Sequence, residues 1–158
     1  MMKKTLPFFL LLAAALLLAG CGSQTKTGDA AQKSALPLRE AVNAIAPDAA
    51  GLVSLTAEDL ADVMGIEPGD YQEAVYLQST NLGSREIVAI RAKDAQGQKQ
   101  IVQRLEAYLE QRRKETRNYL PDAYKLLADA KVESKNLTVV LFVGEKSAEE
   151  SAKLLAGE

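Results

Sequence analysis

Acidic side chains are the first candidates for chemistry in this chain of 158 residues. Glu67, Asp70 and Glu73 cluster around a Pro-Gly turn and could ligate calcium weakly, although they lack the alternating oxygen spacing of a calcium loop. A solvated turn explains this cluster better than a calcium site. Glu73 and Glu86 could instead act as a carboxylate pair on a carbohydrate, provided that the fold brings them face to face in a cleft.

Two further spacings match parts of known patterns. Ser23 and Lys26 have the Ser-x-x-Lys spacing of penicillin-interacting acylases, but they lie in a polar segment in which nothing can hold the two groups in register. Residues 144–147, Gly-Glu-Lys-Ser, lie between an expected strand and an expected helix, like the end of a phosphate-binding loop. Glu145 separates the glycine from the lysine and the upstream glycine is missing, so we expect this segment to cap a helix.

The chain has few side chains suited to catalysis. It has no histidine and a single cysteine. Without histidine it lacks the side chain best suited to proton transfer near neutral pH, the standard serine triad and most zinc sites. We therefore expect no enzyme activity, no cofactor and no metal site.

A basic run and the tyrosines are the candidates for an interaction surface. The basic run lies near the end of the longest expected helix, where its cations complement the negative end of the helix dipole. The same cations could contact an anionic wall polymer or lipid headgroups. Tyrosines occur more often at the edges of a core than in a platform that stacks on sugars. The residues of this candidate surface are Tyr71, Tyr76, Arg112, Arg113, Lys114 and Arg117.

The first 20 residues have the properties of a lipoprotein signal peptide. Two lysines precede an apolar run at residues 6–18, which is shorter than the roughly 20 apolar residues of a stable membrane helix. Residues 18–21, Leu-Ala-Gly-Cys, resemble the motif at which lipoprotein precursors are cleaved and acylated. The resemblance implies cleavage between Gly20 and Cys21 and attachment of diacylglycerol to the Cys21 thiol. Acyl chains contribute about 0.8 kcal/mol per buried methylene, so the protein would stay at the cell membrane, facing outside the cytoplasm.

The mature part is long enough for one domain with a modest core. Removal of the first 20 residues leaves 138, with 17 basic and 21 acidic residues and a formal charge of −4. This acidic balance argues against nucleic acid as a partner. An acylated cysteine leaves no thiol for a disulfide, which favours a compact α+β domain. We expect residues 21–36 to form the lipidated cysteine and a flexible tether, and residues 37–158 to form the domain.

Periodicity predicts nine elements in the order α-α-β-β-α-α-β-β-α. The run at 137–143 is the most apolar and should be the central strand. Ser147 and Glu150 have the spacing of a capping box that opens the last helix. The simplest fold is a four-stranded, mainly antiparallel sheet of two hairpins with the helices packed on one face. The expected strands and the longest helix lie at 71–78, 86–91, 131–135, 137–143 and 95–119.

Several segments, in this order, resemble a known family. They are residues 60–71, 87–94, Leu105 and Arg112 of the long helix, 119–121 and 137–143. Over residues 52–157 the chain is similar to the small lipoproteins of Gram-positive, mostly gut-dwelling Firmicutes that are catalogued as domain of unknown function 4358. The resemblance implies a lipid-anchored extracytoplasmic domain, and it implies no activity because none is established for the family.

Two functions of different classes fit these observations. The first is a non-catalytic lipoprotein whose domain binds an envelope protein or a small ligand. The second is an enzyme that acts on envelope carbohydrate through a carboxylate pair. A cleft with facing acids would favour the enzyme, and a flat face with few acids would remove it. The sequence favours the binding domain.

Overall fold

A five-stranded antiparallel sheet lies at the centre of the part that the computed structural model describes, residues 36–81 and 85–158. All four neighbouring pairs are antiparallel. The expected α+β class is confirmed, but the sheet has five strands and not four, because the two-residue β1 pairs with the end of β2. Across the sheet the strands are β1 (Val53–Ser54), β2 (Tyr71–Gln78), β3 (Glu86–Ala92), β5 (Thr138–Val143) and β4 (Val132–Lys135).

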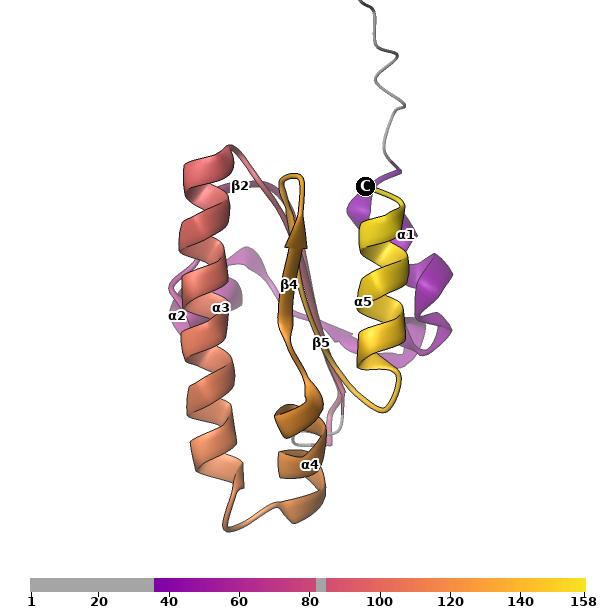
Figure 1. Cartoon of the computed structure of the whole chain (residues 1–158), viewed down its shortest axis with the longest axis vertical. Coiled ribbons are helices and arrows are strands. Elements are labelled where there is room, and N and C mark those ends of the chain that lie inside the picture. The colour runs from indigo at the N-terminus through magenta and orange to yellow at the C-terminus, as the bar shows by residue number, and fades with distance from the viewer. Residues whose placement is uncertain (1–35, 82–84) are drawn as a thin grey trace, which may run out of the picture. The chain divides into compact units, whose positions relative to one another are not determined.

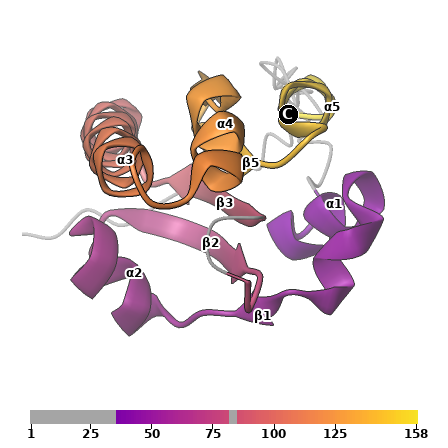
Figure 2. The same cartoon turned by 90° about the horizontal axis from the view of Figure 1, so that it is seen from below.

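Helices cover both faces of the sheet (Figures 1 and 2). The expectation of helices on a single face is therefore wrong. The reason is that β3 and β5 are apolar on both sides, so either face left open would expose a row of aliphatic side chains to water. One face carries α2 (Ala57–Met64), α3 (Ala95–Thr116) and α4 (Pro121–Asp129). The other carries α1 (Leu38–Ile45), the short 3-10 helix η1 (Pro47–Gly51) and α5 (Ser147–Ala156).

Alternate residues of the inner strands supply the two cores. On β3, Val88 and Ile90 enter the core under α3, whereas Ile87 and Ala89 enter the core under α1 and α5. All six residues of β5 are buried. The run that was expected to be the central strand is thus an inner strand, directly beside the middle strand β3.

The start of α2 is closed by a capping box, whereas the capping box expected for α5 is not formed. The Thr56 amide donates to Asp59 over 2.7 Å and the Asp59 amide donates to Thr56 over 3.1 Å, which is a capping box. Gly65 ends that helix with a φ of 67°. In α5, no side chain caps the first turn, and the expected partner Glu150 binds elsewhere. The expected capping box of α5 is therefore wrong.

The described ranges contain no helix that is long and apolar enough to cross a bilayer. The expected cleavage site at Gly20 and Cys21, the signal peptide and nearly all of the tether lie outside the described residues.

Candidate functional site

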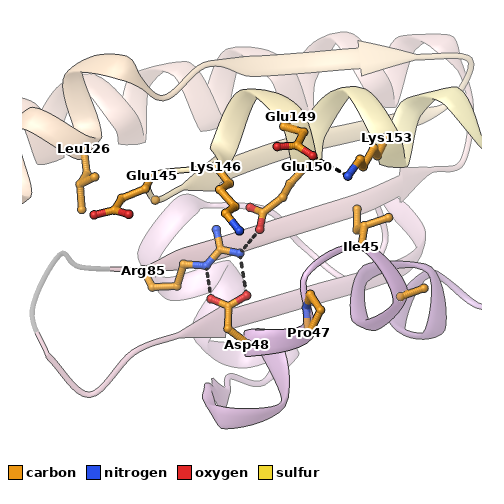
Figure 3. A pocket seen from close by; sticks show the side chains of 12 residues that line it. Ile45, Pro47, Asp48, Arg85, Leu126, Glu145, Lys146, Glu149, Glu150 and Lys153 are labelled. Carbon is orange, nitrogen blue, oxygen red and sulfur yellow. Dashed lines mark hydrogen bonds and ion pairs between the residues drawn. The ribbon is translucent and has the colours of Figure 1, made fainter.

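A groove of about 830 Å³ opens where α1, η1, α4 and the start of α5 meet (Figure 3). This volume falls in the usual range for sites that bind small molecules. Apolar side chains from α1 and α4, Ile45 and Leu126, line part of it. The basic side chains that line it are Arg85, Lys146 and Lys153, and the acidic ones are Asp48, Glu145, Glu149 and Glu150.

Arg85, which directly precedes β3, forms the floor of the groove. Its Nε and Nη2 atoms donate to the two carboxylate oxygens of Asp48 over 2.8 and 3.2 Å. Nη2 also donates to Oε1 of Glu150 over 2.8 Å, and Nη1 donates to the carbonyl oxygen of Val143 over 3.2 Å. The Arg85 side chain is only 11% exposed. One guanidinium therefore ties η1, β5 and α5 together.

The floor has more negative than positive formal charge. Hydrogen bonds from Arg85 hold the pKa of Asp48 below its usual value. Burial works to lower the pKa of Arg85, but its bonds to Asp48 and Glu150 outweigh burial and raise that pKa. With one cation against two carboxyl groups, the formal charge of the floor is −1.

The carboxylate of Glu150 is only half satisfied. Its side chain is 8% exposed, and its Oε2 atom has no hydrogen-bond partner among the described residues. A buried acceptor without a donor costs about 1–3 kcal/mol, and native proteins carry few of them. Glu150, which lines the groove, thus keeps a buried acceptor atom to which none of the described residues donates.

Gly144 makes room for this arrangement. Its φ of +152° suits glycine, and a Cβ placed there would lie 2.9 Å from Nη1 of Arg85. The glycine that the sequence offered as part of a phosphate loop therefore packs its backbone against the Arg85 side chain.

A second arginine, Arg91 on β3, also binds two carboxylates, and each of their oxygens has a donor. Arg91 donates to Glu73 over 2.9 Å and to Glu158 over 2.9 Å. The other oxygen of Glu73 accepts from the amide of Leu38 over 2.6 Å, and that of Glu158 accepts from Thr138 over 2.9 Å. This cluster ties α1 and the end of the chain to the sheet. It resembles the Arg85 cluster in that one arginine binds two carboxylates.

The acidic residues that the sequence singled out do not meet. Glu73 pairs with Arg91, whereas Asp70 accepts from Arg104 over 2.6 Å and from the amide of Glu67 over 3.1 Å. Within the described ranges, no group of three or more acidic or cysteine side chains is placed to hold a metal ion. The calcium alternative thus has no geometric support.

Glu73 and Glu86 lie on opposite faces of the sheet. Glu73 lies on the face of α1, where it binds the amide of Leu38. Glu86 lies under α3 and accepts a hydrogen bond of 2.7 Å from the Tyr108 hydroxyl. The carboxylate pair considered from the sequence is therefore not formed.

Glu86 is buried in the core under α3. It is 2% exposed, and burial raises its pKa. Tyr76 lies beside it, and burial raises the pKa of Tyr76 to about 12. Because these groups are closed to solvent, we assign them a structural role.

Replacing Glu86 with glutamine should change the pH dependence of stability. The folded-state pKa lies above the ordinary value of 4.5, so the folded protein holds this proton more tightly than the unfolded chain does. Wild-type stability should therefore fall as pH rises from about 4.5 through the folded-state pKa. Glu86→Gln keeps the acceptor for Tyr108 but has no carboxyl group to titrate. The free energy of unfolding of the variant should therefore increase relative to that of the wild type as pH rises. Urea unfolding from about pH 4.5 to 8 tests this; a constant difference would contradict it.

The candidate surface of tyrosines and basic residues is not one exposed patch. Tyr76 is 4% exposed, so its assignment to an interaction surface was wrong; it faces the core under α3. Tyr71 is half-buried against that core. The aromatic rings thus serve packing first.

The basic residues of that surface divide into bound and exposed side chains. Arg113 donates to the carbonyl oxygens of Leu127 over 2.9 Å and of Ala130 over 2.8 Å, so it satisfies the C-terminal end of α4. Arg112 is half-buried, with its guanidinium carbon 5.9 Å from the ring centre of Tyr108. Lys114 and Arg117 are exposed.

The family model described as "Domain of unknown function (DUF4358)" matches residues 47–144, more than half of the chain. The chain belongs to this family. The DUF4358 segment contains Asp48, Arg85 and Gly144, whereas Glu150 and the other groove residues of α5 follow it. The groove is therefore built by the DUF4358 segment together with the end of α1 before it and residues 145–153 after it. No curated protein and no solved structure matches the chain.

Sequence analysis did not single out Asp48 or Arg85. Asp48 and Arg85 are 37 positions apart, and Arg85 and Glu150 are 65 positions apart, so no short motif contains them. Glu150 was noticed, but its spacing from Ser147 was assigned to a capping box.

Proposed function

We propose that this protein is a lipid-anchored, extracytoplasmic domain that binds a small ligand in the Arg85 groove without catalysing a reaction. The observation that carries the proposal is the groove of about 830 Å³ with the half-satisfied Glu150 carboxylate in its floor. Sites for small ligands combine a concave surface with a few well-placed polar groups. A ligand that donates to Glu150 would supply the hydrogen bond that the fold leaves out.

The charge pairing in the groove supports binding over catalysis. Arg85 lowers the pKa of Asp48, and a hydrogen bond from Lys153 lowers the pKa of Glu149. A general acid or base works best when its pKa lies near the working pH, so these shifts move both groups away from that role. Carboxylates that stay charged are instead suited to holding a ligand.

The lipid anchor rests on residues 18–21 and is tested by replacing Cys21 with serine. We expect the wild-type protein to begin at Cys21 and to carry diacylglycerol there. Cys21→Ser should lose all lipid and keep residues 1–20, because both acylation and cleavage need the thiol. Mass spectrometry of the N-terminal peptide from membranes measures this, with Ser23→Ala as a control that should be processed normally. A wild-type protein with an unmodified cysteine would contradict the anchor.

A variant that fills the groove tests the binding function. Ala44 lines the groove from α1, whereas its neighbour Asn43 is exposed and does not line it. Native mass spectrometry of protein released from its own membranes should show a non-covalent ligand on the wild type and on Asn43→Trp. Ala44→Trp should lose most of that ligand, because the indole occupies its space. Equal retention by all three proteins would place the ligand elsewhere and contradict the proposal.

A further inference from the structure

The charges of the groove indicate what kind of ligand it takes, if the proposed binding function holds. Its floor contains one guanidinium and two carboxylates, and Oε2 of Glu150 lacks a donor. An anionic group would be repelled by a floor with a formal charge of −1, whereas an ammonium group would add both the missing charge and the missing donor. The floor therefore selects a ligand with a protonated amine.

The rim of the groove carries two lysines and two glutamates, and Lys153 pairs with Glu149, which leaves Lys146 as the cation to consider. Lys146 and Lys153 line it, and Lys146 is exposed, with no ion pair among the described contacts shorter than 4.0 Å. Arg85 chiefly lowers the pKa of Asp48 and Lys153 that of Glu149, and the charge of Lys146 adds a smaller contribution to both. Figure 3 shows the Lys146 side chain extending toward Arg85 and Glu150. A long, exposed lysine in this position can turn outward and meet an anionic group of the ligand.

These two features lead us to propose that the groove binds a short zwitterion, a free amino acid or a dipeptide. The ligand ammonium binds between Asp48 and Oε2 of Glu150, and the ligand carboxylate binds Lys146 after that lysine has turned away from the floor. Oε2 is buried, so the ligand ammonium reaches it only as the Lys146 side chain moves away. Ile45 and Leu126 offer apolar contact to a small aliphatic side chain. The inference rests on the proposed function and names the ligand class for the same groove.

A titration with three related peptides tests the proposal. The probes are alanyl-alanine, N-acetyl-alanyl-alanine and alanyl-alanine amide. They are added to residues 21–158 with Cys21→Ser, produced without the signal peptide, so that no detergent is needed. Amide shifts of residues 144–150, followed by NMR, report binding. We expect alanyl-alanine to shift these amides, and each blocked peptide to bind about tenfold or more weakly, because one charge-assisted contact is lost.

Matched variants assign the two ends of the ligand. Glu150→Gln keeps the acceptor for Arg85 but replaces Oε2 with a donor. It should therefore weaken the binding of alanyl-alanine about tenfold and leave the binding of N-acetyl-alanyl-alanine unchanged. Lys146→Gln, at an exposed position, should weaken the binding of alanyl-alanine but not the binding of alanyl-alanine amide. Glu73→Gln changes the equivalent carboxylate at Arg91 and should bind like the wild type.

Two results would overturn the ligand class. One is that alanyl-alanine leaves residues 144–150 unshifted at millimolar concentration, and the other is that N-acetyl-alanyl-alanine binds as well as the parent. If Ala44→Trp still removed a natural ligand in native mass spectrometry, the binding function would stand and only the zwitterion would be wrong. If the variant removed nothing, the binding function itself would fail.

Discussion

Arg85→Met should lower the free energy of unfolding by about 3–5 kcal/mol. Methionine has a similar length but removes the cation from Glu150, and a buried carboxyl group that loses its partner is strongly destabilising. Asp48 adds little to this loss, because more than half of its side chain is exposed. Urea unfolding near neutral pH, followed by circular dichroism, measures the change.

Two comparison variants separate the buried pair from general effects of charge. Arg85→Met combined with Glu150→Leu should recover much of the loss, since replacing a buried ion pair by apolar residues is often close to neutral. Lys153→Met breaks an exposed pair with Glu149 and should change stability by less than about 1 kcal/mol. A loss below about 1 kcal/mol for Arg85→Met alone would show that Arg85 does not hold Glu150.

Leu141→Ala and Phe142→Ala should each cost about 3–5 kcal/mol. These neighbours on β5 are both fully buried, but Leu141 belongs to the core under α3 and Phe142 to the core under α1 and α5. Large-to-small changes in a packed core lose this much through transfer and cavity terms. Urea unfolding of both variants tests whether helices cover both faces of the sheet.

Val63→Ala is the control for this pair, because Val63 on α2 is 52% exposed and should tolerate the change. If either Leu141→Ala or Phe142→Ala behaved like Val63→Ala, the corresponding face of β5 would be open to solvent. The two-sided architecture would then be wrong.

Local patterns predicted most of the elements, but the chain order differs from the expected one because η1 and β1 lie between α1 and α2. Alternation located β2 at residues 71–78, and the change to a helical period at Ala95 located the start of α3. Thr56 and Gly65 lie at the two ends of α2, and such caps are local signals because capping depends only on near neighbours in the chain. Signals of this kind act within a few residues and are visible in the sequence.

The missed features depend on contacts between distant residues. β1 has two residues, too few for any alternation, and exists because it pairs with the end of β2. The continuous apolar run at 137–143 is typical of a strand that is buried on both faces of a sheet. The two predicted hairpins nevertheless favoured a sheet with helices on one face. The groove needs η1, Arg85 and α5 together, and only the fold brings these segments into contact.

Glu150 shows how a local signal can mislead. Ser147 and Glu150 have the spacing of a capping box, yet the first turn of α5 has no side-chain cap. Arg85 offers Glu150 a charged donor, which makes a stronger hydrogen bond than a backbone amide does. Glu150 therefore binds Arg85 and does not cap the first turn of α5, and its side chain lines the groove.

Photo-crosslinking in living cells shows whether the Arg85 groove holds a ligand at the cell envelope. A photoreactive amino acid is placed at Ala44 in the groove or at Asn43 beside it, and adducts are identified by mass spectrometry. We expect a reproducible small-molecule or short-peptide adduct from position 44 that is absent from position 43. The same adducts from both positions, or none from position 44, would contradict it.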